Sequence, residues 1–214
     1  TALSGFGDLL GVQSNVSNEL GILNTPDLLY KVVKQMNLNV KYYTSGYLRP
    51  TELYNKTPFT VTFIPKSDST LPTTYTFNTK NLNSAANFEL KVSNDDIDKT
   101  VKGKFEDTIA VPTGKILIHK TGIPFDEASG YYFTSTNTDQ VVLDIQSNLS
   151  IAIPSADATI LSLSYNSNVP KKAEDVLNQL INEYTARNLN EKNKISDSTI
   201  TFIDGRINIV SAEL

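Results

Sequence analysis

The chain contains 214 residues, of which 39% are hydrophobic and 20% charged, and its formal net charge is -4. This composition is typical of a soluble globular protein, and no cluster of lysine or arginine indicates a nucleic-acid surface or a polybasic membrane patch. The absence of cysteine excludes disulfides, a thiol nucleophile and any cysteine-ligated metal site. No apolar run is long enough to cross a membrane.

Both ends of the chain indicate a segment of a longer protein. The chain opens on Thr1, and residues 1–13 carry three glycines without a periodic apolar face, which predicts a flexible lead-in. At the other end, an apolar stripe is still in phase at Leu214, and no glycine, asparagine or proline ends the pattern. We therefore expect a parent protein that extends past both ends.

Helices are predicted in the first part of the chain. A short helix spans residues 15–23, and a clearer one begins after Thr25, a favoured capping residue, with Pro26 at the first helical position. Its apolar face repeats at helical spacing up to Met36. The next predicted elements are a strand at residues 40–43, a helical turn at residues 52–54 and an alternating strand at residues 59–64.

The middle of the chain has a different character. Short alternating runs are separated by Asn, Asp, Gly and Pro, which predicts antiparallel strands with hairpin-length connections. We interpret residues 65–129 as a β-rich insertion. Its predicted strands lie at residues 75–77, 87–92, 108–111 and 115–118.

Helices and strands alternate again after this insertion. A strand at residues 131–134 leads to a helix capped by Thr138, and strands at residues 149–153 and 158–165 precede a helix from Pro170 to the end of the chain. Residues 14–64 and 130–214 would then form one α/β base. The predicted fold class is α+β, with a mixed sheet, packed helices and a long C-terminal helix beside the β-rich insertion.

A search for catalytic chemistry finds no convergent set of residues. His119 is the only histidine, which excludes a two-histidine metal face, and we expect it to be a surface or hydrogen-bonded strand residue. The acidic clusters at residues 95–98, 106–107 and 126–127 lack the spacing of a calcium loop and are typical of solvated turns, although they leave a carboxylate pair open. We therefore predict no catalytic, metal-binding or cofactor-binding residue.

Tyrosines form two adjacent pairs in predicted strands. Tyrosine is common in strands and at half-buried sheet edges, so these residues can be ordinary strand residues. Aromatic rings next to Asn and Asp side chains are also what a sugar-binding surface needs. The candidate glycan contacts are Tyr42, Tyr43, Tyr131 and Tyr132.

The predicted terminal helix has two different halves. Residues 170–184 carry the broad apolar stripe of a helix that packs on a globular core. After a polar stretch at residues 187–194, apolar residues return at steps of three and four, which is the spacing of a helix that packs on another helix. A core helix and a stalk or subunit contact both remain open. The candidate oligomer contacts are Ile200, Ile203, Ile207, Val210 and Leu214.

Two sets of motifs carry a resemblance to a known family. The first, in the terminal helix, comprises Pro170, Ala173, Leu177, Asn178 and Tyr184, followed by the stretch 202–207 and the final Glu213-Leu214. The second comprises residues 19–23, 28–33, 38–43 and 52–59. Together they resemble the chain-length determinant (Wzz-like) proteins, the polysaccharide co-polymerases of bacterial surface-polysaccharide assembly. The front motifs most resemble the branch fused to a cytoplasmic tyrosine autokinase. The resemblance covers both ends of the chain well and the middle third poorly.

The resemblance implies a location and a role. It implies a periplasmic domain between two inner-membrane helices, with residues 1–13 as the juxtamembrane linker. It also implies a homo-oligomeric scaffold, without catalysis in this segment, that regulates chain length and export of capsular polysaccharide or exopolysaccharide. The implied partners are the polysaccharide polymerase, the export machinery and the growing glycan, and a kinase domain would follow in the parent.

Two other classes of protein stay open from the residues. A non-catalytic extracytoplasmic carbohydrate-binding module would require tyrosines exposed on a shallow surface. A hydrolase would require a pocket that gathers two of the acidic side chains.

Overall fold

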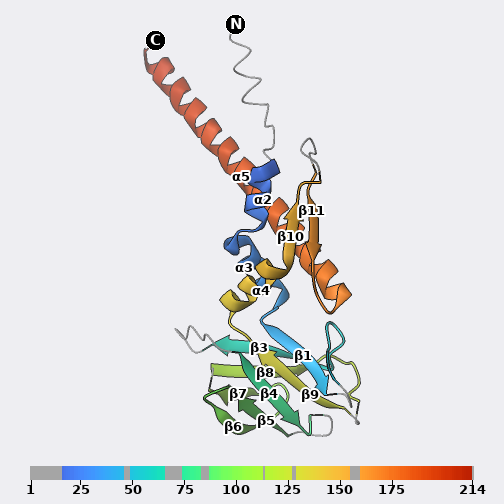
Figure 1. Ribbon diagram of the computed structural model, residues 1–214. Helices are drawn as coiled ribbons and strands as arrows, with labels where there is room; N and C mark the ends of the chain where they lie inside the picture. The colour runs from blue at the N-terminus through green and yellow to red at the C-terminus, as the bar shows by residue number, and fades with distance from the viewer. Residues whose placement is uncertain are drawn as a thin grey trace.

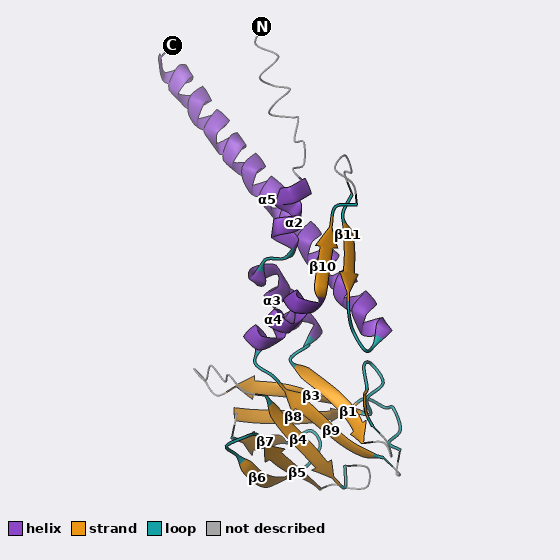
Figure 2. Cartoon of the chain, in the orientation of Figure 1, coloured by secondary structure: helices purple, strands orange, loops and turns teal. Residues whose placement is uncertain are grey.

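The computed structural model describes residues 16–45, 49–65, 74–82, 87–112, 114–126, 129–154 and 160–213. It shows an elongated α+β protein (Figures 1 and 2). A β-sandwich lies at one end, a layer of helices lies next to it, and the second half of the terminal helix projects at the opposite end. The predicted α+β class and the long C-terminal helix are therefore confirmed. The predicted linker at residues 1–13 lies outside the described residues.

The helices are α2 (Val16–Leu23), α3 (Pro26–Met36), α4 (Thr138–Asn148) and α5 (Pro170–Glu213). The strands of the first half are β1 (Val40–Ser45), β2 (Pro50–Glu52), β3 (Phe59–Pro65), β4 (Tyr75–Lys80), β5 (Phe88–Ser93) and β6 (Asp98–Gly103). The remaining strands are β7 (Thr108–Val111), β8 (Gly114–Lys120), β9 (Gly130–Ser135), β10 (Leu149–Ala152) and β11 (Ser162–Tyr165).

The strands form three sheets. A six-stranded sheet has the order β2-β1-β9-β4-β5-β6, a three-stranded sheet has the order β3-β8-β7, and β10 pairs with β11. Every pairing in the described part of the chain is antiparallel, so the expectation of a mixed sheet was wrong. The short connections between β1 and β2, β5 and β6, and β7 and β8 allow only antiparallel pairing, and β9 and β8 pair antiparallel with strands much earlier in the chain.

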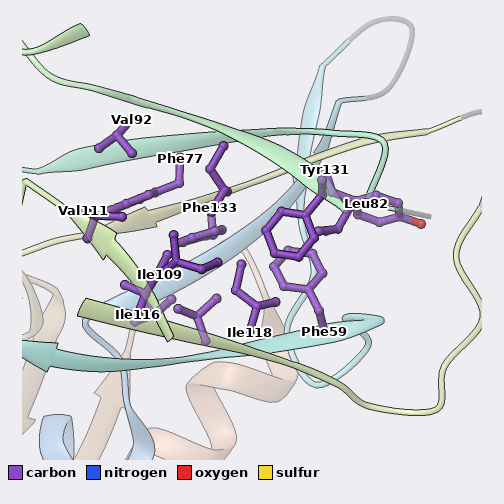
Figure 3. Close-up of a cluster of buried hydrophobic side chains, with 14 of the residues drawn as sticks. Phe59, Phe77, Leu82, Val92, Ile109, Val111, Ile116, Ile118, Tyr131 and Phe133 are labelled. Atoms are coloured by element: carbon purple, nitrogen blue, oxygen red, sulfur yellow. The ribbon is translucent and has the colours of Figure 1, made fainter. Parts of the chain in front are cut away.

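The core of the sandwich combines aromatic and aliphatic side chains from both sheets (Figure 3). Phe77 and Phe133, neighbours on β4 and β9, stack with ring centroids 4.5 Å apart and are fully buried. On the facing three-stranded sheet, Ile116 and Ile118 of β8 are fully buried. Burial of each such side chain contributes about 1.5–3 kcal/mol, so this layer holds the two sheets together.

Strands from the β-rich middle of the chain share sheets with strands from both ends. β4, β5 and β6 extend the sheet that begins with β1 and β9, and β7 and β8 join β3. One hydrophobic cluster runs through all of them, from Val40 to Phe133. The middle third therefore completes the sandwich.

The helical layer has a second core. Leu28, Leu29 and Val32 on one face of α3 are fully buried. They form one cluster with buried residues of α4 and with Val176 and Leu180 of α5. The apolar period of α3 therefore predicted its buried face correctly.

The predicted helix caps were partly wrong. Thr25 occupies the N-cap position of α3, but its hydroxyl donates to the carbonyl oxygen of Ile22 at 2.8 Å instead of capping the helix. The N-cap of α4 is Asn137, whose side-chain oxygen accepts from the backbone N–H of Asp139 at 3.0 Å. The capping residue thus lies one position before Thr138.

Two strands differ from the sequence-based expectation. The predicted helical turn at residues 52–54 begins instead as the last residue of β2, because Glu52 pairs with Tyr43 across the sheet. The edge strand β6 was not predicted, because its residues are mostly polar and exposed and show no apolar alternation.

A glycine-to-alanine change at position 103 tests the sandwich packing. A Cβ on Gly103 would overlap the side chain of Ile109 and lie 2.9 Å from a ring carbon of Phe88. We expect Gly103→Ala to lower the free energy of unfolding by about 1–3 kcal/mol, measured by urea denaturation. The matched control is Gly205→Ala in α5, where a Cβ meets nothing within 4 Å and helix propensity favours alanine by about 1 kcal/mol. Equal stability of the two variants would contradict this packing.

Candidate functional site

A buried ion pair joins the first turn of α5 to the edge of the sandwich. The ammonium of Lys172 lies 2.5 Å from a carboxylate oxygen of Glu52, at the end of β2. Lys172 is only 7% exposed. A charge removed from water in this way is tolerated only when a partner of opposite charge is held against it. The pair therefore fixes where α5 begins relative to the sheet.

A second set of polar contacts lies one turn further along α5. The Tyr54 hydroxyl donates to a carboxylate oxygen of Asp175 at 2.9 Å, and the Lys171 ammonium lies 2.9 Å from the same carboxylate group. The hydrogen bonds from Lys171 and then from Tyr54 lower the pKa of Asp175. Burial, followed by the hydrogen bond to Asp175, raises the pKa of Tyr54 to about 12. These groups hold the same edge of the sandwich as Glu52 does.

The family-motif residues of α5 differ in burial and in contacts. Pro170 is the first residue of the helix, where a missing backbone N–H costs nothing. Ala173 and Leu177 are half-buried, and Asn178 is exposed. The Tyr184 hydroxyl donates to the carboxylate of Glu19 in α2. This hydrogen bond therefore joins α2 to α5 at Tyr184.

The four candidate glycan contacts divide between the two faces of the sheet. Tyr131 is 8% exposed, and its hydroxyl oxygen accepts from the backbone N–H of Asp126 at 2.8 Å. Tyr42 packs edge-on against Phe59, with ring centroids 5.4 Å apart, and its hydroxyl oxygen accepts from Val61 N–H. Tyr131 lies in the sandwich core and the half-buried Tyr42 packs against it. The interpretation of these two residues as glycan contacts was wrong, because they point to the inner face of the sheet and successive strand residues point to opposite faces.

Tyr43 and Tyr132 lie on the outward face of the same sheet. They are directly opposite each other on β1 and β9, with ring centroids 4.9 Å apart and planes inclined by 12°. Both side chains are half-buried. Burial is the main cause that raises the pKa of each phenol. They form a stacked aromatic pair on an otherwise polar face.

The second half of α5 contacts nothing else in the described part of the chain. Every described side chain from residue 189 to residue 209 is exposed. This includes the candidate oligomer contacts Ile200, Ile203 and Ile207, at 58%, 49% and 57% exposure. The side chain of Val210 and the whole of Leu214 lie outside the described residues. Figure 1 shows this half of the helix projecting away from the sandwich.

A second exposed apolar stripe was missed from the sequence. Ile195, Phe202 and Ile209 are 66%, 67% and 54% exposed and recur at steps of seven. The step of seven is itself the missed signal, since it places all three along one line of a helix. The projecting half of α5 therefore carries two adjacent apolar stripes.

The acidic and histidine side chains do not converge. Among the described residues, no group of three or more His, Asp or Glu side chains is placed to hold a metal ion. His119 Nδ1 lies 2.6 Å from a carboxylate oxygen of Glu106 at an exposed position on β8, as a hydrogen-bonded strand residue. Within the described ranges, no helix has the length and apolar content needed to cross a membrane.

Comparisons with known proteins give one distant similarity. No family model matches the chain. Over 101 residues, it is 27% identical to a protein of Erwinia amylovora that is named as the tyrosine-protein kinase AmsA. The matched region covers 47% of this chain but only 14% of that protein. The chain thus spans a small part of a much longer relative.

Removal of Glu52 tests the ion pair that anchors α5. We expect Glu52→Leu to lower the free energy of unfolding by about 1–3 kcal/mol, because it leaves the Lys172 ammonium buried without its partner. The double variant Glu52→Leu with Lys172→Met should recover most of this loss, since it removes both charges. Lys192→Met, at an exposed lysine in the projecting half of α5, is the control and should change stability by less than about 0.5 kcal/mol. A single variant as stable as the wild type would contradict the anchoring role.

The raised tyrosine pKa values predict a loss of stability in alkali. Burial, with the nearby charges of Asp144 and Glu52, raises the pKa of Tyr165 to about 12. A pKa above the unfolded value of about 10 means that folding favours the neutral phenol, so its contribution is complete below about pH 10 and is lost as the pH rises toward 12. We expect Tyr165→Phe to lose stability less steeply across this window, measured by urea denaturation at each pH. Identical slopes for the variant and the wild type would refute this assignment.

Proposed function

We propose that this chain is the scaffold domain of a polysaccharide co-polymerase on the periplasmic face of a bacterial inner membrane. It carries no catalytic site of its own. It assembles with copies of itself through α5 and thereby regulates the chain length and export of a capsular polysaccharide or exopolysaccharide. We further propose that its parent protein carries a cytoplasmic tyrosine-protein kinase domain.

The observation that carries the proposal is the unsupported second half of α5. A helix in water without a packing partner is marginally stable, because most helical stability comes from burial of an apolar face. Here the exposed face holds Ile200, Ile203 and Ile207 at heptad-like steps. Burial of one such side chain contributes about 1.5–3 kcal/mol. A partner helix is the simplest surface that would bury them, and a second copy supplies the same stripes.

The comparison supports the kinase-containing parent. The relative is named as a tyrosine-protein kinase, and the matched region is a small part of its length. This agrees with a non-kinase domain inside a kinase-containing protein. The motifs at both ends of the chain also support this proposal. They resemble the co-polymerases, and the front motifs most resemble the branch fused to an autokinase.

The mechanism that follows is geometric. The anchoring contacts of Lys172 and Asp175 hold the start of α5 on the sandwich. Because α5 has 44 residues and is about 66 Å long, its direction sets how far neighbouring sandwiches stand apart in an assembly. Polymer length would then depend on the assembly state of the scaffold.

Charged substitutions on α5 test the proposal in the full-length parent. We expect Ile203→Asp with Ile207→Asp to weaken self-association by at least about a hundredfold, because two buried contacts of about 1.5–3 kcal/mol each are lost. Sedimentation of the detergent-solubilised parent measures assembly, and gel analysis of the surface glycan measures its length distribution. Both should change together.

The matched control places the same charges on the other side of the helix. Thr201→Asp with Asn208→Asp lies about 100–160° around the helix from Ile203 and Ile207, and it should leave assembly and glycan length unchanged. Both variants should fold, since all four side chains are exposed. Unchanged assembly and glycan length in the isoleucine variant would refute the proposal, and equal losses in both variants would refute the role of the apolar stripe.

A further inference from the structure

The outward face of the six-stranded sheet carries a straight row of side chains from all six strands. The printed registers place Tyr43 opposite Glu52 on one side and opposite Tyr132 on the other. Tyr132 lies opposite Asn78, Asn78 opposite Lys91, and Lys91 opposite Thr100. The complete row is Glu52, Tyr43, Tyr132, Asn78, Lys91 and Thr100. It runs across the strands at the strand spacing of about 4.8 Å.

The two ends of this row differ in how far the chain covers them. At the β2 end, Glu52 is bound to Lys172 of α5, so the helical layer borders the sheet there. At the other end, Asn78, Lys91 and Thr100 are exposed. The open part of the row, from Tyr132 to Thr100, therefore extends about 14 Å across β9, β4, β5 and β6.

The chemistry of the open part suits a sugar chain. The stacked pair of Tyr43 and Tyr132 supplies the only large rings on this face of the described strands, and each ring joins an apolar body to a polar hydroxyl. Asn78 and Thr100 add an amide and a hydroxyl that can donate and accept hydrogen bonds. No large aliphatic side chain lies in the row, so it lacks the central apolar anchor that a protein partner would need.

The charge of the same surface selects an acidic glycan. Lys80, Lys91 and Lys102 point outward from β4, β5 and β6, against two outward carboxylates, Glu89 and Asp98. Lys91 is paired with Asp98 at 3.0 Å. Glu89 lies between Lys80 and Lys102, opposite each of them in the strand register, so one carboxylate faces two ammonium groups. The surface is therefore locally cationic on a chain whose net charge is -4. Three ammonium groups against two carboxylates leave one excess positive charge, which complements carboxylates on a polymer.

We propose that this outward face binds an extended acidic polysaccharide, with Tyr132 and Asn78 contacting the sugar rings and Lys80 and Lys102 contacting its carboxylates. The inference rests on the proposed function and names the class of glycan that the scaffold contacts. The polymer lies along the row, across the strands. The exposed half of α5 at the opposite end of the molecule takes no part in this contact (Figure 1).

The test compares two forms of one polymer on the intact chain. Polygalacturonate oligosaccharides carry free carboxylates, and their methyl esters have the same backbone without the charges. We expect the acidic form to bind at least about tenfold more tightly by calorimetry, and the difference to shrink as salt is added. Equal affinity for both forms, or no binding of either at millimolar concentration, would overturn the proposal.

Substitutions assign the binding to this face. Lys80→Gln with Lys102→Gln should lower the affinity for the acidic form about tenfold or more, and Tyr132→Ala should weaken both forms. The control is Lys99→Gln, an exposed lysine on β6 that points to the other face of the sheet, and it should change nothing. The lysine variants alter only exposed side chains, so they remain informative where Tyr132→Ala loses stability. Equal losses with Lys99→Gln and with the Lys80 and Lys102 pair would overturn the assignment.

Failure here and failure of the proposed function give different results. A face that binds no acidic glycan, in a parent whose glycan length still responds to the Ile203 and Ile207 substitutions, removes only this inference. Binding to the face in a parent whose assembly and glycan length ignore those substitutions refutes the proposed function and leaves the glycan-binding face in place.

Discussion

The pairing of β1 with β9 is the constraint on which the rest of the molecule depends. Val40 lies opposite Ser135 at one end of this pair, and the backbone N–H of Thr136 donates to the carbonyl oxygen of Asn39 at 2.9 Å just beyond it. Because α3 ends just before β1 and α4 begins just after β9, the pairing sets these two helices side by side. Their apolar stripes then form one surface, on which Val176 and Leu180 of α5 are fully buried. The sandwich therefore orders the helical layer, and the helical layer directs α5.

The polar contacts at the start of α5 add direction more than stability. Removing two charges from water costs about as much as their attraction returns, so a buried pair such as Lys172 and Glu52 adds little net free energy. Its geometry is nevertheless demanding, because Lys172 has no exposed position in which to keep its charge. The bond from Tyr54 to Asp175 fixes a second point on the same edge. A long helix held at two points near its first turn keeps one direction, and a small tilt there would become a large displacement at its far end.

The sequence predicted those features that local periodicity controls. The stripe of α3, the alternation in β3 and β5, and the length of α5 all follow from side chains within a few residues of each other. Features that depend on distant partners could not be predicted in this way. Adjacent strand residues such as Tyr42 and Tyr43 face opposite sides, but only the packing of the second sheet on the first determines which of them is covered. Likewise, the partner of Lys172 lies 120 residues earlier in the chain, and the polar edge strand β6 has no apolar alternation to reveal it.

The two surfaces of the molecule are connected through one side chain. The row across the outward face begins at Glu52, and the carboxylate of Glu52 is also the partner of Lys172 in α5. Next in the row are Tyr43 and Tyr132, which stack on each other from directly paired strands. Burial first, and the nearby charge of Glu52 second, raise the pKa of Tyr43. One carboxylate thus lies beside the aromatic pair on the sheet and also positions the first turn of α5.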